Sequence, residues 1–463
     1  MNNHEITCTN LGIDVKKKRY RRYYKAGLLD DLDEAYADEV KKYWLDYYDK
    51  EVDPILHLAL YNLTGIKDVR IAPGSEMWND FIPYFNDRNM VTGYKDKNIY
   101  DKLFETKNAP RIYLKRVRGH YYNTENEEVS FNEAEKILVN RGPINYIVKP
   151  STSNNGVGIE LLQYKENNLW LNDEVIGLTD LENLYGYNFM VQEVVKQHPI
   201  MKNPHPSSVN TLRMVTLRWN NKIEYLLTFA RFGADNSVKD NAGAGGVVVG
   251  VKDNGEFLDF GIDEETNFHK KHPTTGYVFS EMPPIPNFNE HIQFIKDLHK
   301  EAIHLDFISW DIAVGENAEP IFIEANFAGA TPLYQLSTGM PIFREFTEEV
   351  LQHVNKNWQI ERDVGKGIST YRKEIKQLKR KNKQLKRTNK KIRRKNKKLE
   401  KENEIANQTI ESTRGKLKRT KKKNTRLKKV SSDYEQYNED LKNSTSWKLT
   451  APLRKVKGKL KKK

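Results

Sequence analysis

The feature that most constrains how this chain can fold is an abrupt change of composition near residue 365. Residues 361–463 hold 38 Lys and Arg but 11 Asp and Glu, a net charge of +27. Because the whole chain carries +14, residues 1–360 carry −13. A segment with so much charge of one sign cannot bury its side chains in a compact core. The sequence therefore predicts an acidic globular body and an extended basic segment, and any polyanion is expected to bind the latter.

The basic segment carries a heptad pattern that predicts a coiled coil over residues 365–440. One core position holds Leu or Ile and the other mostly Asn, as in Leu378, Leu385, Ile392 and Leu399 against Ile375, Asn382, Asn389, Asn396 and Asn403. Asn at this position favours a parallel homodimer of fixed register. Repeated Asn and unbalanced Lys weaken such a coil, so a solvated single helix or a disordered basic tail is the alternative.

Residues 441–463 predict a basic amphipathic tail. Its apolar residues are interleaved with Lys and Arg: Trp447, Leu449, Leu453, Val456 and Leu460. Such a segment suits an anionic membrane surface, which the interleaved apolar residues favour over a solvated tail or a nucleic-acid contact.

The cysteine content and the hydropathy of the chain limit its location. Cys8 is the single cysteine, so an internal disulfide and a cysteine metal site are both excluded. No apolar run of about 18 residues is present, and the first residues lack an apolar stretch, which argues against membrane spanning and secretion. We expect a cytoplasmic protein, peripheral on the inner face of the plasma membrane if the tail docks there.

The body is expected to be α+β. Residues 1–90 carry apolar residues at helical spacing and predict a helical N-terminal region. Residues 111–330 hold short β-rich runs separated by Gly, Asn and Asp, which predict mainly antiparallel strands. Two further helices are expected at residues 289–305 and 341–358.

The stretch INYIVKPSTSNNGVGIEL, residues 144–161, allows two interpretations. It fits a hairpin with an unusual turn, or a strand whose final residue, Lys149, reaches a phosphate under a flexible loop. Gly156 and Gly158 permit the close approach or the positive φ that such a loop needs. No Gly-Lys-Ser/Thr follows, so this is not a Walker A loop.

A second pattern lies near the end of the body. Asp311 stands in one apolar strand-like run, and Glu324 and Asn326 stand in the next. Paired as a hairpin, the two runs bring the three side chains to one face, because Glu324 and Asn326 are two residues apart. Two carboxylates and an amide suit Mg²⁺ that bridges substrate phosphates, whereas the alternative is a hairpin with solvated carboxylates.

In this order, the Lys149 loop, MVQEVV, NTLRMVTL, Asp311 and the Glu324–Asn326 pair resemble the ATP-grasp superfamily over roughly residues 90–345. More narrowly, QHPIMKNPHPSSVNTLRMVTL, DNAGAGGVVVGV, HPTTGY and SWDIAV with PIFIEAN resemble the sugar-transfer-associated ATP-grasp family. That family is found with bacterial exopolysaccharide and cell-wall polymer genes, and its relatives include the teichuronopeptide-biosynthesis type. The resemblance implies an ATP-grasp fold in a catalytic domain of residues 91–360, with two α+β subdomains that clasp ATP.

The resemblance also implies a nucleotide site. The QEVV hinge would pair its backbone at Glu193–Val195 with the adenine edge, and Lys149 would contact the α/β phosphates together with a second lysine. We favour Lys97 over Lys102 for that second lysine. Further cofactor-binding residues would be the hinge and loop positions Gln192, Glu193, Val194, Val195, Ser153, Asn154, Asn155, Gly156 and Gly158.

The remaining roles concern the reacting groups. Asp311, Glu324 and Asn326 would hold one or two Mg²⁺. Arg213 would face the γ-phosphate or the acyl-phosphate, its alternative being a structural arginine paired across the sheet. Acceptor or phosphate contacts would come from Arg231, Lys239, Asp240 and Asn241, with Gly243, Gly245 and Gly246 giving backbone access.

Two further observations limit this site. His269 and His272 are interpreted as loop histidines rather than metal ligands. VKQHPIMKNPHP, which follows the hinge, offers no acidic residue for the ribose hydroxyls.

The activity that the resemblance implies is an ATP-dependent carboxylate–amine ligase that acts through an acyl-phosphate and modifies a cell-surface glycan or its precursor. The chain shows no evident Ser-His-Asp or catalytic Cys arrangement, and this chemistry needs none. The alternatives are an ATP-grasp kinase or phosphotransferase on a sugar, and a non-catalytic scaffold that recruits glycosyltransferases through the coiled coil.

Overall fold

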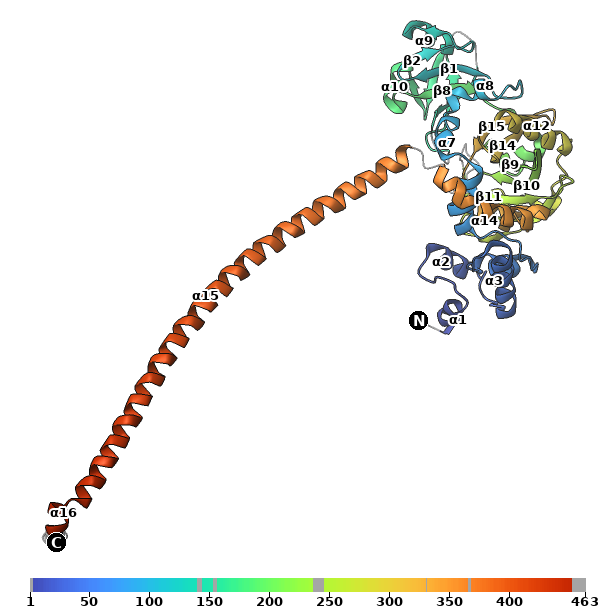
Figure 1. Cartoon of the computed structure of the whole chain (residues 1–463). Helices are drawn as coiled ribbons and strands as arrows, with labels where there is room; N and C mark the ends of the chain where they lie inside the picture. The colour runs from blue at the N-terminus through green and yellow to red at the C-terminus, as the bar shows by residue number, and fades with distance from the viewer. Residues whose placement is uncertain are drawn as a thin grey trace, which may run out of the picture. The chain divides into compact units, whose positions relative to one another are not determined.

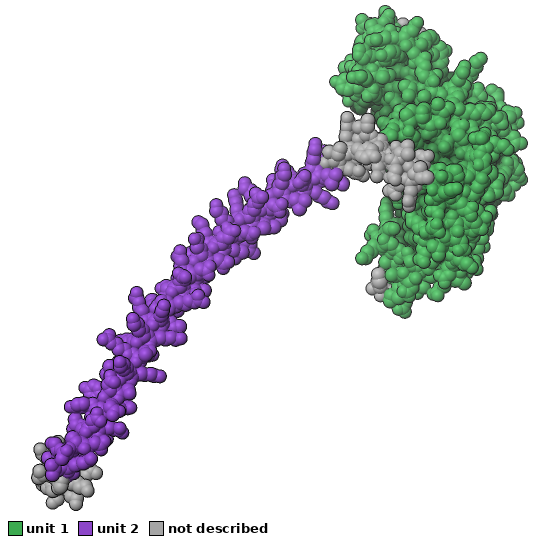
Figure 2. Space-filling model, in the orientation of Figure 1, with its two compact units in different colours: residues 1–367 green, residues 368–463 purple. Residues whose placement is uncertain are grey.

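The computed structural model describes residues 3–139, 144–152, 156–235, 245–329, 331–364 and 368–451, the side chains of residues 359–375 excepted. The chain divides into two compact units, residues 1–367 and residues 368–463 (Figure 2).

The first unit begins with helices, as the sequence predicts for residues 1–90. In α3, Asp33 caps the N-terminus by accepting from the Tyr36 N–H. The elements of this region are α1 (Asn3–Asn10), α2 (Lys18–Lys25), α3 (Glu34–Tyr48), α4 (Ile55–Thr64), α5 (Gly74–Glu76), the π turn η1 (Met77–Phe81), α6 (Ile82–Phe85) and α7 (Arg88–Tyr94).

A smaller antiparallel sheet of eight strands follows, in the order β3-β2-β1-β8-β4-β5-β6-β7. Its core is closed by α9 (Phe131–Val139) and α10 (Leu178–Tyr185), which lie against the strands (Figure 1). It is entered through η2 (Lys97–Ile99) and α8 (Tyr100–Leu103). The strands are β1 (Ile112–Val117), β2 (His120–Tyr122), β3 (Glu128–Val129), β4 (Tyr146–Pro150), β5 (Glu160–Lys165), β6 (Asn168–Leu171), β7 (Glu174–Ile176) and β8 (Phe189–Glu193).

The larger sheet has seven strands, also antiparallel, in the order β13-β12-β11-β10-β9-β14-β15. The strands are β9 (Thr211–Trp219), β10 (Lys222–Phe232), β11 (Val247–Val251), β12 (Phe257–Asp263), β13 (Phe268–His269), β14 (Phe307–Val314) and β15 (Pro320–Asn326). Its helices are α11 (Pro199–Lys202), α12 (Phe288–Glu301), α13 (Thr331–Thr338) and α14 (Thr347–Val364), with the short turns η4 (Phe279–Glu281) and η5 (Arg344–Phe346).

Both helices expected from the sequence in this region are present with shifted ends. The first ends at Glu301 rather than 305, because Ala302 turns back to the His299 carbonyl oxygen and Leu305 bridges Asn86. The second begins at Thr347 rather than 341, since Pro341–Phe346 forms a tight turn first. Two mainly antiparallel sheets with flanking helices confirm the α+β class.

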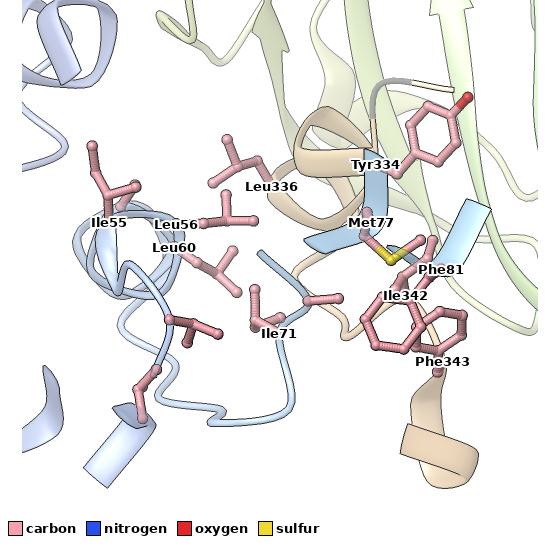
Figure 3. Packing of buried hydrophobic residues seen from close by; sticks show 14 of the residues in the cluster. Ile55, Leu56, Leu60, Ile71, Met77, Phe81, Tyr334, Leu336, Ile342 and Phe343 are labelled. Atoms are coloured by element: carbon pink, nitrogen blue, oxygen red, sulfur yellow. The ribbon is translucent and has the colours of Figure 1, made fainter. Parts of the chain in front are cut away.

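The two faces of the larger sheet are covered by different layers. On β9, Met214 packs in one core cluster and Val215 in the other, as alternate strand residues must. The Met214 face packs against α12. The Val215 face packs against α13, α14 and the N-terminal helices. In Figure 3, α4 lies toward Leu336 of α13, and Phe81 lies by Phe343, with ring centroids 5.3 Å apart.

The second unit is dominated by one continuous helix, α15 (Ile368–Asn443), followed by α16 (Thr445–Leu449), which Ser444 caps. The heptad residues of α15 are exposed in the single chain; Leu378 keeps 63% of its surface and Ile392 keeps 50%. The helix has the form that the heptads require, and its pairing with a second copy stays a prediction. None of the described helices combines the length and apolar character needed to cross a bilayer.

Close packing of α13 on the larger sheet depends on Gly250 in β11. A methyl group at Gly250 would lie 2.2 Å from the Ser337 carbonyl oxygen and 2.7 Å from Leu258 Cδ1. We therefore expect Gly250→Ala to lower the free energy of unfolding by about 1–3 kcal/mol, measured by thermal and denaturant unfolding.

The matched control is Gly93→Ala in α7, where an added methyl group has no neighbour within 4 Å. It should leave stability unchanged or raise it by up to about 1 kcal/mol, since Ala favours a helix. Equal melting temperatures for the two variants would contradict the close packing of α13 on β11.

Candidate active site

The centre of the candidate site is a row of charged residues across three neighbouring strands. Arg213 on β9 lies directly opposite Asp311 on β14, and Asp311 lies opposite Glu324 on β15. Opposite residues of antiparallel strands point to the same face, so the three side chains share one side of the sheet. Asn326, two residues after Glu324, donates from Nδ2 to Asp311 Oδ2 at 3.2 Å. The structure thus brings together the three residues that the sequence proposes for a metal.

Asp311 is held by two arginines. Arg213 donates from Nε to Oδ1 and from Nη2 to Oδ2, the latter at 2.9 Å, and Arg231 Nη1 donates to Oδ2 at 2.9 Å. The Asp311 side chain is 7% exposed, so this buried charge needs such partners. Burial opposes the charged form of Arg213, but Asp311 and Tyr334 outweigh it and raise the pKa of the guanidinium. In this structure Arg213 is therefore a structural arginine paired across the sheet, the alternative to a phosphate contact that the sequence left open.

Two lysines approach Glu324 from the smaller sheet and from the segment before it. Lys97 of η2 is buried, and its Nζ lies 3.1 Å from Glu324 Oε1. Its backbone N–H donates to the Ser151 carbonyl oxygen at 2.9 Å, which ties η2 to the end of β4. Lys102, the other sequence candidate, is exposed on α8. The geometry therefore favours Lys97.

Lys149 is the penultimate residue of β4 and is 5% exposed. Burial, and next the nearby charge of Lys97, lower the pKa of its ammonium to about 8, against a smaller opposing effect of Glu324. The charged form of a buried lysine near another cation is disfavoured, and a phosphate that binds between the two cations stabilises that charged form.

The hinge segment begins at the end of β8, where Gln192, Glu193 and Val195 line the cleft. The Glu193 N–H donates to the Arg111 carbonyl oxygen at 2.9 Å, and the Arg111 N–H donates to Glu193 Oε2 at 3.3 Å. The N–H and the side chain of Glu193 are thus both bonded to Arg111, the residue before strand β1.

The two glycines after Lys149 have the close contacts or the positive φ that the sequence predicts for this loop. Gly156 lines the cleft, and Gly158 has a φ of +77° and packs against Pro150, where a methyl group would come within 2.9 Å of Cγ. Only glycine tolerates both conditions. The remaining predicted positions of the two loops lie outside the described residues: Ser153, Asn154, Asn155, Lys239, Asp240, Asn241 and Gly243.

A single cleft of about 550 Å³ joins these groups. It is lined by residues of both sheets, among them Lys149, Arg213, Arg231, Asp311, Glu324 and Asn326. The whole lining holds six cations and four carboxylates, and Lys97 pairs with Glu324 beside it. This excess of positive charge suits the negative charge of a nucleoside triphosphate with one divalent cation. Among the described residues no cluster of three His, Cys, Asp or Glu that could hold a metal ion is present.

Sequence reasoning missed two parts of this cleft. Tyr334 of α13 accepts a hydrogen bond from Arg213 Nη1 at 2.9 Å, and α2 supplies Lys18, Arg19, Arg22 and Tyr23 to the lining. The only signal for α2 was the basic run KKKRYRRYYK, which is more than 100 residues away from Lys149 in the chain.

The sequence assigns two histidines to loops, but His269 lies on strand β13 because it pairs with Gly261 of β12. Both histidines have structural partners. His272 is buried, and its Nε2 lies 2.8 Å from the Gly233 carbonyl oxygen. Burial lowers the pKa of His272. His269 Nε2 lies 3.1 Å from Asp263 Oδ2.

Two antiparallel sheets around one cleft, with a strand-end lysine and a Glu-x-Asn pair facing it, define an ATP-grasp protein. The particular family follows from a family model, sugar-transfer associated ATP-grasp, which matches residues 76–355. Because this match covers more than half of the chain, the protein belongs to that family. No curated protein matched the chain.

The solved structures that resemble this chain include three enzymes whose sequence identity to it is low. D-alanine–D-alanine ligase from Bacillus anthracis has a TM-score of 0.32 and 14% identity, covering 57% of this chain and 69% of its own. The D-Ala:D-Ser ligase VanG from Enterococcus faecalis has a TM-score of 0.33 and 12% identity, and the match covers 56% of this chain and 61% of the ligase. The biotin carboxylase domain of 2-oxoglutarate carboxylase from Hydrogenobacter thermophilus has a TM-score of 0.33 and 11% identity. That match covers 57% of this chain and 46% of the other.

The lowered pKa of Lys149 predicts that nucleotide binding is coupled to proton uptake. Near pH 8 about half of the Lys149 side chains are neutral without nucleotide, and bound phosphate favours the charged form. We expect about half a proton to be taken up per Mg–ATP at pH 8, and the affinity to fall as the pH rises above 8. Calorimetry in buffers of different ionisation enthalpy measures this uptake.

Lys149→Arg is the control, since arginine stays protonated throughout this range. The variant should bind nucleotide without the proton uptake at pH 8. Equal uptake by both proteins would assign the proton to another group and contradict the prediction.

Proposed function

We propose that this protein is an ATP- and Mg²⁺-dependent ligase that joins a carboxylate to an amine. The substrate would be a bacterial cell-surface polysaccharide or its precursor, for instance a uronic acid that receives an amino acid. The observation that carries this proposal is the convergence of Lys149, Arg213 and Arg231 with Asp311 and Glu324 in one cleft, with Lys97 paired to Glu324. Membership of a family associated with sugar transfer supports the choice of substrate class.

The residue types suit one or two Mg²⁺ ions, and an ion bound to Asp311 Oδ2 would replace hydrogen bonds that Arg231 and Asn326 donate to it. Asp311 and Glu324 are opposite one another on adjacent strands, and Asn326 adds an amide on the same face, which gives hard oxygen donors. The Asn326 amide presents Nδ2 to Asp311, so its oxygen is available on the other side of the amide group. When bound there, Mg²⁺ would neutralise charge on the phosphate oxygens of ATP.

The protein residues would then act by position and charge. Lys97 and Lys149 would bind the phosphates from the side of the smaller sheet, and Arg213 and Arg231 would stabilise charge on the transferred phosphoryl group. The substrate carboxylate attacks the γ-phosphorus in line, which breaks the bond to ADP and gives an acyl-phosphate. The amine then attacks the acyl carbon, loses a proton, and releases phosphate as the amide forms. No protein nucleophile takes part.

The proposal predicts that purified protein with Mg–ATP and pools of uronic acids and amino acids forms ADP and a condensed product detectable by mass. Glu324→Gln should reduce ADP formation by about 100-fold or more, because it removes a charged ligand of the Mg²⁺ that would neutralise the phosphates. Glu316→Gln, on the exposed turn of the same hairpin, is the matched control and should retain activity.

Different outcomes identify the rival functions. Transfer of phosphate to a sugar hydroxyl without condensation would show a phosphotransferase instead. Absence of any turnover, with cellular function intact in Glu324→Gln, would show a scaffold.

We also propose that residues 441–463 dock on an anionic membrane, and that α15 pairs as a parallel homodimer. Trp447 and Leu449 at the start of this tail are 38% and 74% exposed in the single chain, and Lys448 lies between them. An exposed aromatic residue among lysines is a common membrane-interface arrangement. Leu453, Val456 and Leu460 lie outside the described residues.

Vesicle flotation tests the docking. The full chain should float with vesicles that contain anionic lipid, less so as salt rises, whereas a chain shortened to residues 1–445 should stay in solution. If both chains remained in solution the docking would be refuted, and equal flotation would assign it to the basic helix rather than the tail.

A further inference from the structure

The cleft has a third wall that belongs to neither sheet. Helix α2 contributes Lys18, Arg19, Arg22 and Tyr23 to the lining of the same cleft that holds Lys149 and Asp311. This helix precedes residue 76, where the match to the family model begins. It is therefore a feature of this chain that the family assignment does not explain.

Helix α2 is held rigidly at this place. Tyr20 and Tyr23 are 4% and 3% exposed and belong to the core cluster that contains Phe229 and Tyr334 from the floor of the cleft. Arg19 Nη2 donates to Asp53 Oδ2 at 2.9 Å, which fixes the helix to the N-terminus of α4. A methyl group on Gly74 would lie 2.6 Å from Pro332 Cγ and 3.6 Å from Arg19 Nη1, so α2 and α13 meet at one point of the rim.

The cations of α2 differ in their partners. Arg19 is neutralised by Asp53, and both side chains are largely buried. Arg22 Nε lies 3.7 Å from Glu265 Oε2, longer than a hydrogen bond, and has no other hydrogen-bond partner within the described residues. Lys18 is exposed, and in the described part of the chain the ion pairs of α2 are those of Arg19 and Arg22. Lys18 and Arg22 can therefore receive an oxyanion from the cleft.

The neighbouring turn between β12 and β13 adds polar groups of a different kind. Glu264 and Thr266 flank Glu265 and also line the cleft. Glu264 is exposed and negatively charged, so it weakens the attraction for an anion alone, but its carboxylate accepts hydrogen bonds from hydroxyl groups. Two cations beside a carboxylate and a hydroxyl suit a ligand that carries both an oxyanion and sugar hydroxyls.

We propose that the α2 wall binds a second oxyanion of an acidic sugar, separate from the carboxylate that ATP activates. This inference rests on the proposed ligase function, because it names the substrate class of that same cleft. Lys18 and Arg22 hold the second oxyanion, and Glu264 accepts from the sugar hydroxyls. The oxyanion is either the carboxylate of a neighbouring uronic acid unit or a phosphate on the same sugar.

Calorimetry on the full chain, with the nucleotide site saturated by Mg²⁺ and a non-hydrolysable ATP analogue, tests the wall. The probes are glucuronate, digalacturonate and glucuronic acid 1-phosphate. At least one of the two probes with a second oxyanion should bind about tenfold or more tightly than glucuronate. Preference for digalacturonate would identify a polymer as the source, and preference for the phosphate would identify an activated precursor.

Two double variants test whether the tighter binding of a probe with a second oxyanion depends on Lys18 and Arg22. The double variant Lys18→Gln with Arg22→Gln should lose it. The control, Arg21→Gln with Lys25→Gln, removes the same charge from two exposed residues of α2 outside the cleft lining and should keep it. Affinity for the ATP analogue and the melting temperature should be unchanged in both. Should the double variant fail to fold, Lys18→Gln alone, at an exposed position, should still reduce the advantage.

Three results would overturn the inference: no advantage of a second oxyanion in the unaltered protein, equal losses in the two double variants, or an advantage that survives Lys18→Gln with Arg22→Gln. The outcome is separable from that of the ligase proposal. An advantage that depends on Lys18 and Arg22, without any condensed product, would leave the oxyanion site standing and refute only the ligase.

Discussion

The candidate site is organised around the Asp311 carboxylate, which is buried in the larger sheet between two guanidinium groups. A carboxylate in this position is unfavourable unless its oxygens are paired, and Arg213 and Arg231 pair both of them. The pairing needs β9, β10 and β14 to be adjacent and in one register, so the electrostatics of the site and the order of the strands depend on each other. Glu324 extends this row by one strand and connects it to Lys97.

The face of the sheet that carries this row is also the face that the N-terminal helices cover. Phe229 and Val215 lie on the Arg213 side and pack in one cluster with α3, α4 and α13. Because α13 carries Tyr334, which hydrogen-bonds Arg213, the hydrophobic contact of α4 with α13 supports the polar site from behind (Figure 3). The segment outside the family match is thus part of the core that positions the cleft, and α2 extends it to the cleft wall.

The chain separates its charges by unit. The body carries the net negative charge and pairs the buried Arg213 and Arg231 of its cleft with Asp311, while the basic residues of the second unit lie on a solvated helix. In α15 the apolar heptad positions are exposed and the surrounding residues are mostly Lys and Arg. A single helix of this composition cannot bury its own apolar positions. A partner helix or an apolar surface is needed to remove them from water.

Features that depend on short spacing in the sequence could be predicted. The strand-end Lys149, the glycines that follow it, the Glu324–Asn326 pair on one strand face and the heptads of α15 all follow from local periodicity, and the family resemblance put them in order. An acidic residue for the ribose hydroxyls could not be identified in this way, because the segment after the hinge contains none.

Only the tertiary structure decided what depends on long-range pairing. It paired Arg213 with Asp311, bonded the Glu193 N–H to Arg111, and brought Tyr334 and the basic run of α2 to the cleft. The physical reason is that register between distant strands and the docking of a helix are fixed by burial of the whole core, which no local pattern encodes.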